Sequence, residues 1–214
     1  MRHFASFGLA AIVLAFAPVA VVKADAIPYG NPGFENATTY TFTAAATANV
    51  KAYFAGSQAG FTNDLGLLVN GVDTGIYGLN NQTSAVGLSL DFGSVTAGDT
   101  LTFVMRNLIP GLGNLYSNPA LNGPYDGGGI HNHIYSTAYT ATSPIIGSIP
   151  AGTYVAFEDL PANFPPDWNY HDETFVFTNV ATSVAPLPST AWVGLALFAG
   201  LGIFQLSRRS TATA

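Results

Sequence analysis

Apolar and polar residues alternate with a period of two along much of this chain. The pattern is clearest over residues 86–92 and 101–106, with apolar positions at Val86, Leu88, Leu90, Phe92, Leu101, Phe103 and Met105. Such alternation places one face of an extended segment on a core and the other in water. We therefore predict a β-strand in each range, joined by a turn at residues 96–99.

Other segments predict further short strands. Residues 65–79 (LGLLVNGVDTGIYGL) are typical of a hairpin, because Asn70-Gly71 supplies the positive φ angles of a tight turn. We also expect strands near residues 40–42, 50–54, 133–139, 154–157 and 175–180. Short strands separated by Gly, Pro and Asn turns, with no sustained helical period, indicate an all-β fold: an antiparallel β-sandwich, with a jelly-roll-like winding as one option.

The two ends of the chain differ from this body. Residues 1–26 have the layout of a secretory signal peptide, with an apolar helix-forming core and a small-x-small site at Ala24-Asp25-Ala26. Residues 189–206 form an apolar stretch that is long enough for a transmembrane helix, and Arg208 and Arg209 follow it at once. We expect a β-sandwich domain over residues 27–182, with a membrane-directed segment over residues 183–214.

The C-terminal segment resembles a known export signal. Pro186-Leu187-Pro188, an apolar span and then Arg208-Arg209 look like the PEP-CTERM sorting signal of Gram-negative bacteria, with Leu187 in place of the usual Glu. The resemblance implies that an exosortase at the inner membrane recognises and cleaves the tail. It also implies a protein that is tethered to the inner membrane by its C-terminal helix and then reaches the cell surface or biofilm matrix. Genes for exopolysaccharide often accompany such proteins.

Composition narrows the function classes. Lys51 and Arg106 are the basic residues of the 27–182 domain, which holds eleven of the twelve acidic residues. Nucleic-acid binding requires cationic patches and is therefore not expected. The chain has no Cys, so an exported domain must be held by core packing, by bound metal or by both.

The carboxylates gather in one segment, FEDLPANFPPDWNYHDETFVF, without a Lys or Arg among them. Converging carboxylates repel one another unless something binds between them, and calcium accepts six to eight oxygen ligands in irregular geometry. In an extended backbone the side chains of Asp167 and Asn169 would point to the same side. The sequence therefore predicts a calcium site at Glu158, Asp159, Asp167, Asn169 and Asp172. The alternative is a solvated acidic loop that aids solubility.

This segment carries a second resemblance. It looks like the closing motif of a domain of unknown function that is common in PEP-CTERM and other exported bacterial proteins. The positions that match are Phe157, Glu158, Asp159, Asp167, Asn169, Tyr170 and Asp172. Two upstream stretches, residues 55–71 and 96–105, look like the same family. Calcium binding is suspected for that family, and the resemblance assigns no role to Glu173.

Two further groups of residues were weighed as sites. His131 and His133, at i and i+2, could present two nitrogens to one ion or supply a general base, and Asp126 could add an accessory ligand. The alternative is that one histidine hydrogen-bonds to a neighbouring loop and the other is exposed. Trp168 and Tyr170 are interpreted first as aromatics that pack the loop.

We expect no enzymatic activity. The stretch around Ser57 lacks the Gly-x-Ser-x-Gly elbow, and a carboxylate pair such as Glu158 and Asp167 lacks the large scaffold that glycosidases use. The prediction is an exported, non-catalytic protein of the cell envelope or matrix with a calcium-stabilised β domain. The alternative is a module that binds carbohydrate such as exopolysaccharide on exposed aromatics: Tyr116, Tyr125, Trp168 and Tyr170.

Overall fold

The computed structural model of the chain describes residues 27–141 and 149–184. The expected signal peptide, the sorting motif and the transmembrane helix at residues 189–206 lie outside the described residues. Among the residues that are described, no helix is long and apolar enough to cross a membrane.

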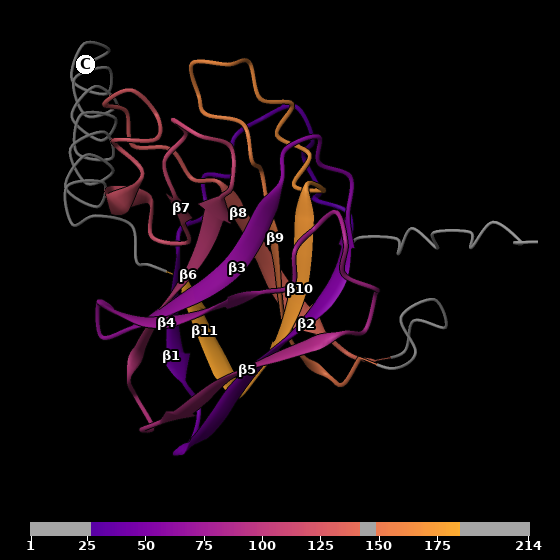
Figure 1. Cartoon of the computed structure of the whole chain (residues 1–214), viewed down its shortest axis with the longest axis vertical. Coiled ribbons are helices and arrows are strands. Elements are labelled where there is room, and N and C mark those ends of the chain that lie inside the picture. Colours follow the sequence, from indigo (N-terminus) through magenta and orange to yellow (C-terminus); the bar gives the residue numbers. More distant parts are fainter. Residues whose placement is uncertain (1–26, 142–148, 185–214) are drawn as a thin grey trace, which may run out of the picture.

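Two antiparallel sheets form the body of the protein, as a β-sandwich requires (Figure 1). The first sheet has the order β11-β1-β6-β3-β4, with β7 also paired to β6, and the second has the order β5-β2-β10-β9-β8. The strands of the first sheet are β1 (Tyr40–Ala44), β3 (Asn63–Val69), β4 (Val72–Gly78), β6 (Thr100–Asn107), β7 (Leu115–Tyr116) and β11 (Val180–Val184). Those of the second are β2 (Ala48–Ser57), β5 (Ser89–Val95), β8 (Ile134–Tyr139), β9 (Gly152–Phe157) and β10 (Glu173–Thr178).

Most of the predicted strands are present, and the hairpin is confirmed. β3 and β4 are joined by Asn70 and Gly71, whose φ angles of 51° and 79° are both in the left-handed region. Residues 96–99 form the turn between β5 and β6. The prediction for residues 86–92 was wrong at its start, because β5 begins at Ser89 and Leu88 is 51% exposed. Gly87 has a φ of 86°, which interrupts the extended backbone there.

The segment predicted as one strand over residues 175–180 is two strands in different sheets. β10 ends at Thr178 and β11 begins at Val180. Asn179 lies between them with a φ of 61°, a conformation that Asn tolerates better than most residues. The chain therefore crosses from the second sheet to the first at this residue.

The two sheets are joined by aromatic side chains in the core. The rings of Phe103 on β6 and Phe177 on β10 stack with their centroids 3.8 Å apart, and both side chains are fully buried. Phe42 on β1 contacts Phe103, and Phe175 lies beside Phe177. Packing of large apolar side chains between the two inner faces supplies the main stabilisation of this fold.

The connection between β9 and β10 lies at one end of the sandwich, at the top of Figure 1. It is drawn in orange, and it contains the acidic segment that the sequence singles out. β9 and β10 are neighbours in the second sheet, with Phe157 opposite Glu173. Both ends of this connection are therefore fixed by the same ladder.

Replacing Phe103 with Ala should lower the free energy of unfolding by about 3–5 kcal/mol, because the change leaves a cavity between the sheets. Urea denaturation of the purified protein measures this loss. Phe34→Ala is the matched control, since Phe34 is 65% exposed, and it should change the stability by less than about 0.5 kcal/mol. A similar effect of both substitutions would contradict the placement of Phe103.

Candidate metal centre

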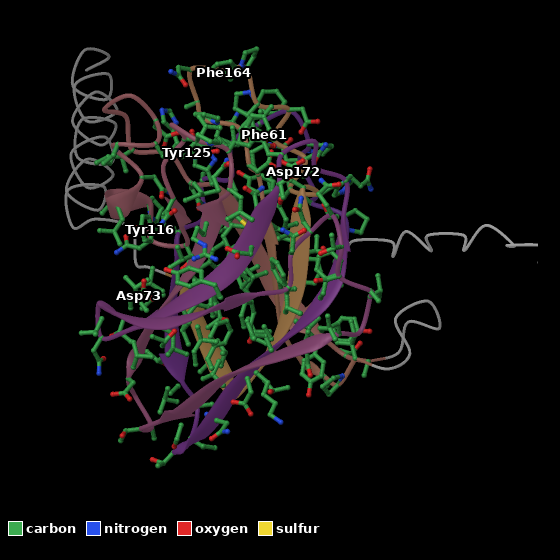
Figure 2. The ribbon with its side chains drawn as sticks, viewed as in Figure 1. Phe61, Asp73, Tyr116, Tyr125, Phe164 and Asp172 are labelled. Carbon is green, nitrogen blue, oxygen red and sulfur yellow. The ribbon has the colours of Figure 1, made fainter. Side chains whose placement is uncertain are left out.

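Three carboxylates meet where β9 ends and β10 begins. Glu158 and Asp159 follow β9 directly, and Asp172 immediately precedes β10. Each of the three offers a carboxylate oxygen, and these oxygens lie within 4.8 Å of one another. Asp172 is labelled in Figure 2 at this end of the sandwich. The antiparallel pairing of β9 with β10 is what brings these residues together across a connection of fifteen residues, 158–172.

Most carboxylates of the cluster are enclosed by the fold, and Asp172 is half-buried. Glu158 is 1% exposed, Asp159 is 4% exposed, and the neighbouring Glu173 is 0% exposed. A solvated acidic loop would leave its side chains in water, so this arrangement differs from that alternative. Burial of a charged carboxylate is costly unless a partner compensates for the lost hydration.

Amide side chains satisfy part of this cluster. Asn63, the first residue of β3, donates from Nδ2 to Asp159 at 3.0 Å and to Glu173 at 2.6 Å. Asn81 donates to the same Glu173 oxygen at 3.0 Å, and the backbone N–H of Asp159 donates to Asp172 at 2.8 Å. Because Asn63 belongs to the first sheet and Glu173 to β10 of the second, the bond between them also connects the sheets.

Other oxygens of the cluster have no donor. Glu158 Oε2, Glu173 Oε2 and Asn63 Oδ1 are buried and make no hydrogen bond. Buried polar atoms in native proteins are nearly always paired. Three such oxygens around one group of carboxylates are an independent indication of a missing electropositive partner, either a cation or protons.

No Lys or Arg in the described part of the chain supplies that partner. Arg106 forms two hydrogen bonds with Asp64, at 2.8 and 2.5 Å, and its guanidinium lies 3.9 Å from the centre of the Tyr77 ring. Lys51 lies 3.5 Å from Asp91. Both basic side chains of the domain are thus paired with carboxylates outside the cluster.

Burial and mutual repulsion alter the acidity of the cluster when it holds no ion. Loss of hydration, followed by repulsion from Asp172 and Asp167, raises the pKa of Glu158 to about 9. Loss of hydration and repulsion from Asp172 raise the pKa of Asp159 to about 7. Burial likewise raises the pKa of Asp172, and it raises that of Glu173 well above the usual range.

Asp167 and Asn169 do not point to the same side of an extended backbone, as the sequence predicted, and they differ in their contacts. The backbone between them is not extended, because Trp168 has a φ of 50°, and Tyr170, which follows Asn169, has a φ of 57°. Asn169 donates to Asp167 at 2.6 Å, and its Oδ1 accepts from the N–H of His171 at 2.8 Å. Asp167 is exposed and acts on the Glu158 carboxyl as a neighbouring charge. Asp167 therefore borders the open side of the cluster, whereas the hydrogen bonds of Asn169 stay within its own loop.

The two histidines do not converge on one point. His131 is half-exposed and lies 2.9 Å from Glu35, whereas His133 is fully buried. His133 has Nδ1 2.9 Å from the carbonyl oxygen of Glu158 and Nε2 3.0 Å from Asp126. Both ring nitrogens of His133 are therefore engaged, one by a backbone carbonyl oxygen and one by Asp126, and neither is bonded to a carboxylate of the acidic cluster.

The aromatic side chains near the cluster are structural rather than exposed. Tyr125 is 7% exposed and its hydroxyl donates to the carbonyl oxygen of Asp159. Tyr170 is 1% exposed, accepts from the N–H of Asn36 at 2.7 Å and donates to Asn132 at 2.9 Å. Trp168 packs beside His133 with ring centroids 5.3 Å apart. Tyr170 is thus a loop-packing aromatic, as expected, Trp168 is half-buried against its neighbours, and Tyr125 and Tyr170 are too buried to present a ring face at the surface.

Sequence reasoning missed the amide partners. Asn63 and Asn81 lie 96 and 92 residues from the carboxylates that they contact, Asp159 and Glu173. No local spacing marks such contacts. The only available indication was that Asn63 lies within residues 55–71, one of the stretches that carries the second resemblance.

The donor set suits a hard cation. Oxygens bound to one calcium ion at about 2.4 Å can lie at most about 4.8 Å apart, which the three carboxylates satisfy. Such an ion would be held by Glu158, Asp159 and Asp172, and Asp167 would lie at the open side of the site. The expected accessory residues have other partners: they are Asp126, His131 and His133. Thiolate ligation is excluded because the chain has no Cys.

Comparison with known proteins adds nothing to this geometry: no family model, no curated protein and no solved structure matches the chain.

In the presence of a chelator, the protein should lose stability as pH rises from about 5 to about 9. The folded pKa values of Glu158 (about 9) and Asp159 (about 7) exceed the ordinary values of 4.5 and 3.8, so the folded state keeps protons that the unfolded chain releases. Urea unfolding at a series of pH values measures the slope. Glu173→Gln should flatten it, since an amide cannot ionise. A free energy of unfolding that increases over this pH range would show that the pKa values of these carboxyl groups are not raised in the folded state.

Proposed function

We propose that this protein is an exported, non-catalytic component of the cell envelope or extracellular matrix, and that calcium stabilises its β-sandwich. The supporting observation is the cluster of buried Glu158 and Asp159 with half-buried Asp172, which has unpaired oxygens beside it and no Lys or Arg partner among the described residues. The ion serves a structural role in this proposal, because it joins the two ends of the 158–172 connection.

Calcium fits better than other common ions. The ligands available are carboxylate oxygens, with amide oxygens close by, in an irregular arrangement enclosed by protein. Magnesium requires near-octahedral geometry and keeps several waters, whereas calcium tolerates irregular cages of protein oxygens. Calcium-binding modules of extracellular proteins typically have Kd values of about 10⁻⁴–10⁻³ M, so an exported protein could be saturated outside the cell.

The export part of the proposal depends on the sequence. The signal peptide at residues 1–26 and the segment with Pro186, Leu187, Pro188, Arg208 and Arg209 support export, exosortase processing and delivery to the surface of a Gram-negative bacterium. A jelly-roll-like winding is also part of the proposal. It is supported by the nested pairing of first strands with last strands, β1 with β11 and β2 with β10.

Calcium at about 100 times its Kd should stabilise the folded state by about 2.7 kcal/mol, because the ion binds the native state alone. For a protein of this size that corresponds to a rise in Tm of about 5–10 °C. A thermal melt of the purified protein in calcium and in chelator measures the shift. An identical Tm in both conditions would exclude a structural calcium ion.

Asp172→Asn gives a sharper test, because it should act with opposite sign in the two conditions. In chelator it should raise Tm by removing repulsion from Glu158 and Asp159, and in calcium it should abolish the shift. Asp99→Asn is the matched control, because Asp99 lies at the other end of the sandwich from the cluster. It precedes the first residue of β6, whereas Asn107, the last residue of β6, pairs with Asn63 of the cluster. This variant should keep the full calcium shift. If Asp172→Asn also keeps it, the ion binds elsewhere.

A further inference from the structure

A cleft lies on the outer face of the first sheet, away from the acidic cluster. It has a volume of about 580 Å³ and is lined by outward-facing residues of β3, β6 and β7, by Gly71 of the β3–β4 turn and by the connections on both sides of β7. Leu68 and Thr102 are opposite each other in the β3–β6 ladder, and Tyr116 is opposite Val104 of β6. In Figure 2, Tyr116 lies along the side of the sandwich and Asp172 at its end. The volume is in the range of small-molecule sites.

The side chains that line the cleft are uncharged, and they include both apolar and polar residues. Leu68, Leu121 and Pro124 supply apolar surface, and no Asp, Glu, Lys or Arg is among the lining residues. The nearby Arg106 is already paired with Asp64. An anionic ligand would find no counter-charge here, and a metal ion would find no carboxylate.

The polar side chains of the cleft are free to bind a ligand. Within the described residues, the side chains of Thr100, Thr102, Asn114 and Tyr116 make no hydrogen bond, whereas Oδ1 of Asn118 accepts from the N–H of Ala120. Thr100 and Thr102 are adjacent on the same face of β6 because they are two residues apart on one strand. Hydroxyl and amide groups both donate and accept, so this surface can pair with a ligand that also does both.

Tyr116 is held in place by its neighbours. Its N–H donates to the side chain of Asn122 at 2.8 Å, and the Asn122 amide donates back to the Tyr116 carbonyl oxygen at 3.0 Å. Asn122 is fully buried, and Ser117, the next residue, bonds to Phe103 of β6. The Tyr116 ring is half-exposed. An aromatic side chain with a fixed backbone offers a preformed surface at low entropic cost.

We propose that this cleft binds a neutral oligosaccharide. A sugar ring has an apolar C–H face that packs on an aromatic ring and a rim of hydroxyls that both donate and accept hydrogen bonds. Tyr116 would be the platform, and Thr100, Thr102 and Asn114 would contact the hydroxyls. This site is independent of the calcium proposal, because it shares no residue with the acidic cluster.

The test is a titration of the purified protein with neutral probes, maltohexaose and cellohexaose, and with an oligogalacturonate as anionic comparator. Calorimetry and saturation-transfer NMR should detect at least one neutral probe and not the anionic one. Absence of saturation transfer from both neutral probes, or preferential binding of the anion, overturns the proposal.

Variants locate the site. Tyr116→Ala should weaken binding at least tenfold, whereas Tyr116→Phe should keep the affinity within about threefold because the ring remains. Thr102→Val should also weaken binding, because it replaces the hydroxyl with a methyl group and leaves the side-chain volume nearly unchanged. Phe34→Ala, an exposed aromatic outside the cleft, should have no effect. The Tyr116, Thr102 and Phe34 variants are first shown to have an unchanged Tm. Asp172→Asn should leave glycan binding unchanged, so the two proposals can fail separately. Equal affinity of wild type and Tyr116→Ala would place the glycan elsewhere.

Discussion

The cost of removing carboxylates from water governs this end of the molecule. Phe157 and Phe175 belong to the apolar core; Glu173 shares the inward face of β10 with Phe175, and Glu158, which follows Phe157, is buried as well. The apolar burial that forms the sandwich therefore also forces negative charge into the protein. Two responses are available, proton uptake and cation binding, and they compete for the same oxygens. Protonation of these carboxyl groups and binding of a cation between them are thus alternative ways of stabilising the same packing arrangement.

The same cluster is a point where the sheets are joined by polar contacts. Elsewhere Phe103 and Phe177 join them by apolar contact, which involves no titratable group and so does not depend directly on pH. At the acidic end the contact runs through Asn63, whose bonds to Asp159 and Glu173 depend on the charge of those side chains. One end of the sandwich is therefore fixed by packing, and the other by an electrostatic balance that the surroundings can shift.

Sequence patterns predicted most strands because alternation and turn residues act over a few positions. Asn70-Gly71 was sufficient to place the β3–β4 hairpin. The failures have non-local causes. The change of sheet at Asn179 depends on a single backbone angle, and the two pairs β7 makes with β6 depend on how a long connection folds back. For the site, the segment was found from its unbalanced charge, but the loop geometry at Asn169 and the amide partners were not. Contacts between residues some 90 or more positions apart leave no mark in local spacing.

The break at Asn179 has a mechanical consequence. Among the strands that the structure describes, β11 is at the edge of its sheet and pairs only with β1, through five residues from Val180 to Val184. β10, in contrast, is flanked by β2 and β9. A pulling force applied to the chain beyond Val184 would load the single β11–β1 ladder first. Peeling of β11 would release about 17 Å of extended chain at about 3.3 Å per residue while β10 kept both of its neighbours. Under such a force, β11 would therefore detach from β1 before the core strands separate.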